Sequence, residues 1–336
     1  MKWIATLLGC MLFILACHRD EPSSVQNEWF LNYPTQFPDP VFPSDNQPNS
    51  ERIALGKKLF FDPLLSIDSS ISCATCHQQN HAFANNDATS NGVFQRPGTR
   101  NVPALFNLAY QPAFLREASL PTLEMQILVP IQEHNEFNSN IVDIALKLKE
   151  IDWYDSMSRL AYQKPPDAFV ITRAIAAFER TLLSANSKYD QVKAGNEQFT
   201  ALEQKGYQLF ANSLNCSKCH PEPFFTNFTA MNNGLYSIYD DPGRWRATGK
   251  AEDSGSFKVP SLRNIALTAP YMFDGSLSTL DDVLNHYSAG GKQGPHQNDL
   301  IKPFTLNAED RQALITFLET LSDAIFIQNP HYQPDP

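Results

Sequence analysis

Two five-residue motifs of the pattern C-x-x-C-H carry the most specific chemistry in this sequence. They are Cys73-Ala74-Thr75-Cys76-His77 and Cys216-Ser217-Lys218-Cys219-His220. The two thiols of such a motif can form thioethers with the vinyl groups of a haem, and the adjacent histidine can ligate the iron. The sequence therefore predicts two covalently attached c-type haems, with His77 and His220 as proximal iron ligands.

A bare C-x-x-C pair also occurs in thioredoxin-like dithiols and in zinc sites. Neither alternative explains a histidine directly after both copies, and no other group of cysteines and histidines completes a zinc tetrad. The two cysteines outside the motifs, Cys10 and Cys17, lie near the N-terminus. The haem interpretation thus accounts for every cysteine beyond residue 17.

The first 49 residues predict export and membrane attachment. A basic start followed by a short apolar run is typical of a signal peptide, and the run is too short to span a bilayer. It ends in Ile14-Leu15-Ala16-Cys17, which resembles a bacterial lipobox, so we expect cleavage of residues 1–16 and lipidation of Cys17. An ordinary secretory signal that leaves Cys17 free is the alternative. Residues 17–49, rich in Pro, Ser, Asn and Gln, are expected to form a flexible tether.

Length and charge limit the class of protein. With 336 residues the chain exceeds one typical domain, and two covalent cofactors would supply apolar surface for two cores. Acidic residues outnumber basic ones 36 to 26, which argues against a nucleic-acid partner. The same acidity suits docking of a cationic electron carrier, and it equally suits a soluble exported protein without one.

Segments around the first haem motif recur around the second. The pairs are Gly56-x-x-Leu59-Phe60 with Gly206-x-x-Leu209-Phe210, Val102–Ala109 with Val259–Ala266, and Thr122-Leu123-Glu124 with Thr279-Leu280-Asp281. The last two pairs share one offset of 157 positions, and helical spacing of apolar residues precedes both motifs. We therefore expect a mostly α-helical protein with two cytochrome c-like haem domains in tandem, over residues 50–165 and 166–336.

The repeat allows one distal haem site to be inferred from the other. Residues 280–287 have an i, i+3, i+4, i+7 apolar face that ends at Tyr287, which predicts an inward Tyr287 and an outward His286. The residue 157 positions before Tyr287 is Pro130, whose side chain cannot ligate iron. One haem is therefore expected to be closed and the other open. Met272 is an alternative ligand of the second iron, because thioether ligation is common in electron-transfer haems.

These segments resemble the bacterial dihaem cytochrome c peroxidase and MauG family over about residues 50 to 325. The matching stretches are Leu55-Gly56-Lys57-Lys58-Leu59-Phe60-Phe61-Asp62-Pro63, Ile71-Ser72 before the first motif, Pro97-Gly98-Thr99-Arg100-Asn101 and Leu267-Thr268-Ala269-Pro270-Tyr271. The resemblance implies that the N-terminal haem reacts with hydrogen peroxide and the C-terminal haem relays electrons. Peroxidases of the family carry Met at the position of Tyr287 and often a removable His ligand at that of Val93, whereas MauG is similar to this chain at both. The resemblance therefore implies Tyr287 as distal ligand of the second haem.

The same resemblance places Gln126, Pro130 and Glu136 over the peroxide-reacting haem. Peroxide cleavage needs a group that takes a proton from one oxygen and returns it to the other, and a desolvated carboxylate has a suitably raised pKa. Glu136 is thus the expected acid–base catalyst, assisted by Gln126. Glu133 and His134 are alternatives from the same loop.

The region between the haems shows both a match to the family and departures from it. The resemblance implies one calcium ion bound by oxygens of Asn101, Thr268 and Pro270. The family has a Trp as electron relay between the haems, whereas Arg116 stands at the matching position here. MauG also uses a surface Trp just before its second motif, where this chain has Leu214-Asn215. These departures argue against MauG's own protein-modifying reaction.

Residues and resemblance together predict an oxidoreductase of the cytochrome-c peroxidase type. It would reduce hydrogen peroxide to water with electrons from a small donor, either a c-type cytochrome or a cupredoxin. We expect a periplasmic protein that is anchored by lipid to a bacterial membrane. The alternatives are a MauG-like dihaem oxidase that modifies a partner protein and an electron carrier without substrate chemistry. The open site over Pro130 argues against the carrier, because a carrier gains from two six-coordinate irons.

Overall fold

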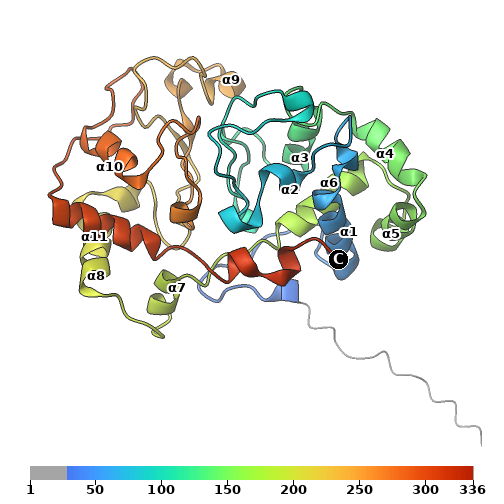
Figure 1. Ribbon diagram of the computed structural model, residues 1–336, viewed down its shortest axis with the longest axis horizontal. Coiled ribbons are helices and arrows are strands. Elements are labelled where there is room, and N and C mark those ends of the chain that lie inside the picture. The colour runs from blue at the N-terminus through green and yellow to red at the C-terminus, as the bar shows by residue number, and fades with distance from the viewer. Residues whose placement is uncertain (1–28, 336) are drawn as a thin grey trace, which may run out of the picture. The chain divides into compact units, whose positions relative to one another are not determined.

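Helices dominate the computed structural model, which describes residues 29–335 (Figure 1). The α-helices in this range are α1 (Ser50–Phe61), α2 (Cys73–Cys76), α3 (Leu123–Gln132), α4 (Ile141–Lys149), α5 (Asp152–Tyr162), α6 (Ala168–Glu179), α7 (Lys188–Lys193), α8 (Ala201–Gln208), α9 (Trp245–Thr248), α10 (Leu280–Ser288) and α11 (Ala308–Glu319). One short antiparallel sheet pairs β1 (Ala230–Met231) with β2 (Phe257–Lys258). The expectation of a mostly helical fold is confirmed.

The chain divides into two compact units, one that ends at Asn32 and one that begins at Tyr33. Of the first unit the structure describes the 3-10 turn Trp29–Leu31 and the residue after it. All of the helices and strands above lie in the second unit, which also contains both C-x-x-C-H motifs.

Two helix pairs organise the second unit, because α1 packs against α6 and α8 packs against α11 (Figure 1). Each pair meets at a glycine of the repeated sequence segments. A Cβ atom on Gly56 would lie 1.8 Å from the carbonyl oxygen of Ala174, and one on Gly206 would lie 2.0 Å from that of Ala313. Glycine is required at both positions because the two backbones touch there.

Gly56→Ala is expected to lower the free energy of unfolding by about 1 to 3 kcal/mol, because the added methyl group overpacks a rigid backbone contact. The check is thermal unfolding of the haem-loaded protein followed by circular dichroism. Lys58→Ala, at an exposed position of the same helix, is the matched control and should leave the melting temperature nearly unchanged. Equal melting temperatures for Gly56→Ala and Lys58→Ala would contradict the close approach of α1 and α6.

The packing of α6 bears on the expected boundary between residues 165 and 166, which remains a prediction. This boundary assigns α6 to the C-terminal domain, whereas α6 packs against α1 and α3. Nine of its residues are buried between Val170 and Glu179. Such a helix must bury its apolar surface against a partner, and its partners lie in the N-terminal half.

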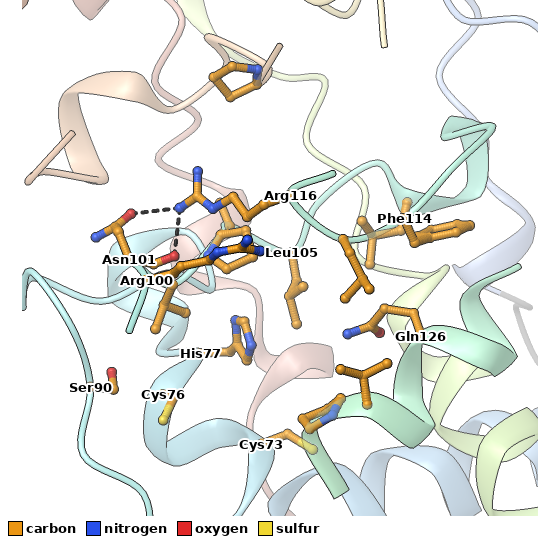
Figure 2. Close-up of a pocket in the computed structure, with 18 of the residues that line it drawn as sticks. Cys73, Cys76, His77, Ser90, Arg100, Asn101, Leu105, Phe114, Arg116 and Gln126 are labelled. Atoms are coloured by element: carbon orange, nitrogen blue, oxygen red, sulfur yellow. Dashed lines mark hydrogen bonds between the residues drawn. The ribbon is translucent and has the colours of Figure 1, made fainter. Parts of the chain in front are cut away.

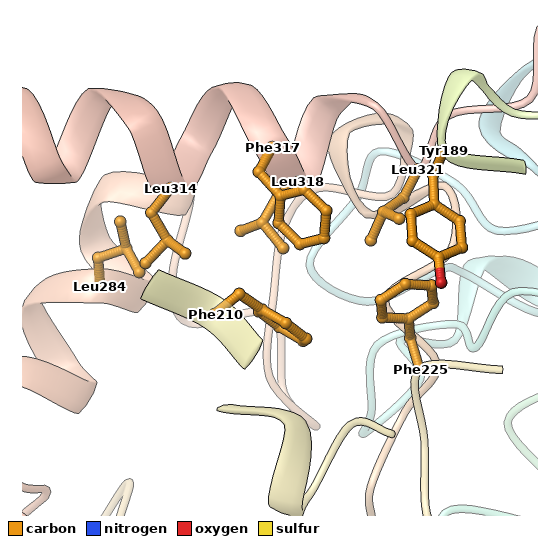
Figure 3. Packing of buried hydrophobic residues seen from close by; sticks show 8 residues of the cluster. All are labelled: Tyr189, Phe210, Phe225, Leu284, Leu314, Phe317, Leu318 and Leu321. Atoms are coloured by element: carbon orange, nitrogen blue, oxygen red, sulfur yellow. The ribbon is translucent and has the colours of Figure 1, made fainter. Parts of the chain in front are cut away.

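Paired contacts recur in the two helical groups. The rings of Phe60 and Phe178 lie 5.3 Å apart between α1 and α6, and those of Phe210 and Phe317 lie 5.3 Å apart beside α11. Figure 3 shows the latter pair within a core that also contains Leu314. Isolated β-bridges join Phe114 to Leu120 and Tyr271 to Leu277. Similar local contacts are thus found in both halves of the chain, while the internal repeat remains a prediction.

Candidate active site

Both haem-attachment motifs present free thiols beside a histidine. Cys73 and Cys76 begin and end α2, where the Ser72 N–H donates to the Thr75 hydroxyl over 3.0 Å. In the second motif Cys216 begins a 3-10 turn, Cys216–Lys218, and Cys219 follows the turn, and both have free thiols. Thioether formation therefore requires no disulfide to be broken.

The two motif histidines have matching environments. His77 Nδ1 lies 2.8 Å from the carbonyl oxygen of Phe83, and His220 Nδ1 lies 3.0 Å from that of Phe225. A carbonyl oxygen accepts a hydrogen bond, so Nδ1 carries the proton and Nε2 keeps its lone pair. Burial lowers the pKa of both rings to about 4, which keeps them neutral at pH 7. This is the state in which an imidazole ligates a metal.

Beside His77 lies a cavity of about 480 Å³, a size within the usual range of ligand pockets. In Figure 2, Gln126 of α3 points into the cavity across from His77 and the two cysteines. Of the predicted site residues, those that line it are Cys73, Cys76, His77, Gln126, Pro130, Glu136, Asn101, Thr268, Pro270 and Met272. Two thiols and a neutral imidazole nitrogen at one cavity fit a c-type haem.

The loop after α3 holds Glu136 at the cavity. The Val93 N–H donates to the carbonyl oxygen of Glu136 over 3.0 Å. Gly92 permits this approach, because a Cβ atom there would lie 2.0 Å from the carbonyl oxygen of Asn135. Val93 is fully buried and does not line the cavity. Its role here is the backbone hydrogen bond that holds the loop of Glu136.

Glu136 has the ionisation that proton transfer requires. Its surroundings raise the pKa of the carboxyl group to about 7, first by burial and second by the negative charge of Glu133. An ordinary glutamate has a pKa of about 4.3. The Glu136 side chain is exposed, like that of His134, but it lines the cavity, where it can take up and release a proton near neutral pH.

The two alternatives to Glu136 differ in position. Glu133 lines the cavity, whereas His134 does not. His134 is exposed, and its Nδ1 lies 3.3 Å from Nη1 of Arg96 and 3.2 Å from Oδ1 of Asn138. The geometry therefore leaves two carboxyl groups of this loop at the cavity and places the histidine outside it.

Sequence reasoning missed Glu179, a buried residue at the end of α6 that also lines the cavity. Burial raises the pKa of its carboxyl group to about 8, and its Oε2 has no hydrogen-bond partner within residues 29–335. The adjacent Arg180 is committed to Glu124, with Nη to Oε distances of 2.6 and 3.0 Å. Glu179 lies four positions after Ile175 on the apolar face of α6. A charged residue on an apolar helix face is unusual, and this pattern could have pointed to Glu179 from the sequence.

Tyr287 and Met272, the two candidate ligands of the second iron, meet at one residue. The Asn233 Nδ2 lies 3.4 Å from Oη of Tyr287 and 3.3 Å from Sδ of Met272. Burial raises the pKa of the Tyr287 hydroxyl, the Asn233 hydrogen bond lowers it, and a negative charge at Cys219 would raise it further. The structure therefore brings Tyr287 and Met272 to one side chain, Asn233. His286, expected at the surface, is half-buried with Nε2 3.1 Å from the carbonyl oxygen of Asn233.

Two of the oxygens expected to bind calcium, both on Asn101, already contact a cation of the chain. Asn101, Thr268 and Pro270 all line the cavity. However, Nη2 of Arg116 donates to the backbone oxygen of Asn101 over 2.7 Å and to its Oδ1 over 2.9 Å. The Thr268 hydroxyl donates to the carbonyl oxygen of Ile265 over 3.3 Å. The two Asn101 oxygens are thus occupied by a cation of the chain itself.

Arg100 and Lys258 are two further cavity residues that sequence reasoning did not single out. Arg100 donates to Glu117 and, through Nε, to Oδ2 of Asp241 over 2.6 Å, which links the two halves of the chain. Lys258 Nζ donates to neutral oxygens, including the carbonyl oxygen of Ala113 at 3.2 Å. Arg100 and Lys258 lie just before the repeated segments Val102–Ala109 and Val259–Ala266, and this position could have singled them out from the sequence.

The expected signal peptide and the lipidated Cys17 lie outside the described residues, as does most of the expected tether. Within residues 29–335, every helix is too short or too polar to cross a membrane.

Comparison with known proteins identifies the family. A model described as di-haem cytochrome c peroxidase matches residues 50–198. The chain is 35% identical over 283 residues to methylamine utilization protein MauG of Methylorubrum extorquens, which covers 83% of this chain and 80% of that protein. The chain belongs to the di-haem cytochrome c peroxidase family. Membership in this family implies two c-type haems and confirms the resemblance inferred from the motifs.

Two further similar proteins carry the two kinds of name found among the relatives, cytochrome-c peroxidase and MauG-like protein. Cytochrome-c peroxidase IdrP1 of Pseudomonas sp. (strain SCT) is 31% identical over an alignment of 342 positions, which covers 89% of each chain. The crystal structure of a MauG-like protein associated with microbial copper homeostasis aligns with a TM-score of 0.84 and 30% identity, covering 90% of this chain and 98% of that one.

Proposed function

We propose that this protein reduces hydrogen peroxide to water at the cavity beside His77, with electrons from a small redox protein. The observation that carries the proposal is the composition of the cavity wall. His77 lies on one side, and the residues contributed by α3 and its following loop include Gln126, Pro130 and Glu136. None of these three provides an imidazole or a thioether as a second iron ligand, so a small substrate has access.

Within the cavity, Glu136 would act as the acid–base group. Its carboxylate takes a proton from one oxygen of hydrogen peroxide and gives it to the other. The second oxygen then leaves as water when the oxygen–oxygen bond breaks. The Gln126 amide can donate a hydrogen bond that orients the peroxide. Haem iron, when bound, supplies the site of oxygen–oxygen cleavage and accepts electrons from the donor.

The electrons would reach the cavity from the second haem site and, before that, from a separate protein. The net charge of −10 favours encounter with a cationic donor, such as a small basic cytochrome or cupredoxin. Two haem modules, one around each motif, and export to the periplasm with lipid attachment at Cys17 belong to the same proposal.

The oxidised protein as isolated is expected to contain one high-spin haem that is five-coordinate or water-ligated and one six-coordinate low-spin haem. The reason is that Pro130 leaves the first site open while Tyr287 or Met272 closes the second. Electron paramagnetic resonance of the ferric protein checks this, and peroxide should change the spectrum without prior reduction. Two low-spin haems, with peroxide reactivity that appears only after half-reduction, would contradict the open site.

A MauG-like oxidase that modifies a partner protein is the second candidate. It is favoured by Tyr287 and by the similarity to MauG and to the MauG-like structure. Arg116 and Leu214-Asn215 stand where MauG has its relay Trp and surface Trp. Steady-state assays decide between them, because a peroxidase oxidises a reduced small cytochrome over many turnovers without a protein substrate.

A further inference from the structure

A half-buried arginine, Arg116, lies where the two halves of the chain meet. Nη2 of Arg116 donates to both oxygens of Asn101, over 2.7 Å to the backbone oxygen and 2.9 Å to Oδ1 (Figure 2). The remaining polar groups of Asn101 are also bonded, its N–H to Phe273 at 2.8 Å and its Nδ2 to Asp87 at 3.2 Å. Asn101 is therefore held in place by a cation on one side and by backbone carbonyls on the other.

The same two oxygens are those that a calcium ion would need. Calcium takes six to eight oxygen ligands at about 2.3 to 2.6 Å, from carboxylates, amide and backbone carbonyls and water. Within residues 29–335 no group of three acidic, histidine or cysteine side chains could hold a metal ion. A guanidinium on the Asn101 oxygens repels a divalent ion at this distance. Calcium and Arg116 therefore exclude each other.

The charges around Arg116 also disfavour a second cation. Lys258 is adjacent, because its N–H donates to the backbone oxygen of Arg116 over 2.6 Å. Glu117, the nearby carboxylate, already pairs with Arg100. Burial and the charge of Arg100 lower the pKa of Arg116 to about 10, against the raising effect of Asp274 and Glu117, so the guanidinium stays charged at neutral pH.

We propose that the Arg116 guanidinium is a tethered cation that takes the place of calcium, so that this protein fixes Asn101 and the junction of its two halves without a bound metal ion. The neighbouring backbone supports this role. Arg244 of the second half donates through Nη1 to the backbone oxygens of Glu117 and Ala118, over 2.8 and 2.9 Å. The segment that carries Arg116 is thus bonded directly to the second half. A cation on the chain is present at high effective concentration and cannot be lost to a chelator.

The first test uses the full chain with both haems. After dialysis against a chelator, the protein should contain much less than one calcium per chain, as measured by mass spectrometry of the metals. Its melting temperature and haem absorption spectrum should be the same in chelator and in millimolar calcium. One calcium per chain that survives dialysis, or a melting temperature that falls in chelator, would overturn the proposal. This measurement requires no peroxide and is independent of the proposed activity.

The second test removes the guanidinium. Arg116→Gln should melt at a lower temperature in chelator, and calcium but not magnesium should restore part of the loss, because the freed Asn101 oxygens accept a large hard cation. Arg116→Lys keeps a charge without the planar fork and should remain insensitive to calcium. Arg246→Gln is the matched control, since Arg246 lines the same cavity, is exposed and pairs with Asp241 at 3.5 Å.

The variants also provide outcomes against the proposal. An Arg116→Gln protein as stable as the unaltered one and indifferent to calcium would show that the guanidinium is dispensable. A destabilised Arg116→Gln protein that calcium does not restore would make Arg116 a packing residue and not a replacement for a metal ion. If the variant fails to fold, the metal content and chelator response of the unaltered protein decide the question.

Discussion

Glu136→Gln is expected to lower peroxide turnover by about 10² to 10⁴-fold, the usual contribution of a positioned acid–base group. Glutamine keeps the size and hydrogen bonding of the side chain but cannot accept the proton from peroxide. The absorption spectra of both haems should survive, because Glu136 ligates neither iron. The measurement is steady-state oxidation of a reduced small cytochrome by peroxide.

Variants of the same loop are the matched controls. His134→Ala should cost little, because the imidazole is exposed and lies outside the cavity. Glu133→Gln should have an intermediate effect, since Glu133 lines the cavity and its charge helps to raise the pKa of Glu136. An unimpaired Glu136→Gln protein beside a crippled His134→Ala protein would transfer the catalytic role to His134.

The pH dependence follows from the raised pKa of Glu136, which is about 7. The carboxylate form is the one that can accept a proton from peroxide, and it predominates above this pKa. Turnover should therefore fall as the pH drops through about 7, and this limb of the profile should be absent from Glu136→Gln. A Glu136→Gln profile that kept the limb would assign it to another group, of which Glu179 is the structural candidate.

Tyr287→Phe is expected to change the spin state and the reduction potential of the second haem together. Burial raises the pKa of the Tyr287 hydroxyl, so the free phenolate is unfavourable in this position, and a ferric ion would supply the compensating charge. A phenolate ligand favours ferric iron, so its removal should raise the potential. Electron paramagnetic resonance measures the spin state, and a potentiometric titration measures the reduction potential.

Met272→Leu is the control for Tyr287→Phe, because Sδ of Met272 and Oη of Tyr287 contact the same Asn233 amide nitrogen. We expect Met272→Leu to leave the second haem six-coordinate and low in potential. If Met272→Leu produced the spectral change and Tyr287→Phe did not, then Met272 would be the ligand. In that case the repeat would still relate α3 to α10, but Tyr287 would be the wrong choice of iron ligand.

The haem-attachment residues and the family could be predicted from the sequence because their signals are local. Each C-x-x-C-H motif places both thiols and the histidine within five positions, so no knowledge of distant contacts is needed. The helix that carries Tyr287 was also predictable, from its apolar spacing and from the Thr279 cap that accepts a hydrogen bond from the N–H of Asp282. Such features depend on neighbours along one helix.

Other features depended on contacts between distant parts of the chain. The packing of α6 against α1 could not be predicted from the sequence, because α1 begins more than 100 residues earlier. His286 was expected at the surface, and its burial follows from the Asn233 loop, which no periodicity in α10 reveals.

The sequence by itself determined the haem chemistry, the helical class and the loop that carries Glu136. Tertiary structure alone decided which groups lose water and which charges meet. It leaves Glu179 without a partner at the cavity, raises the pKa of Glu136, and brings Arg116 onto the oxygens of Asn101. Covalent motifs and helix periodicity are properties of adjacent residues, whereas desolvation and ion pairing depend on everything packed around a group in three dimensions.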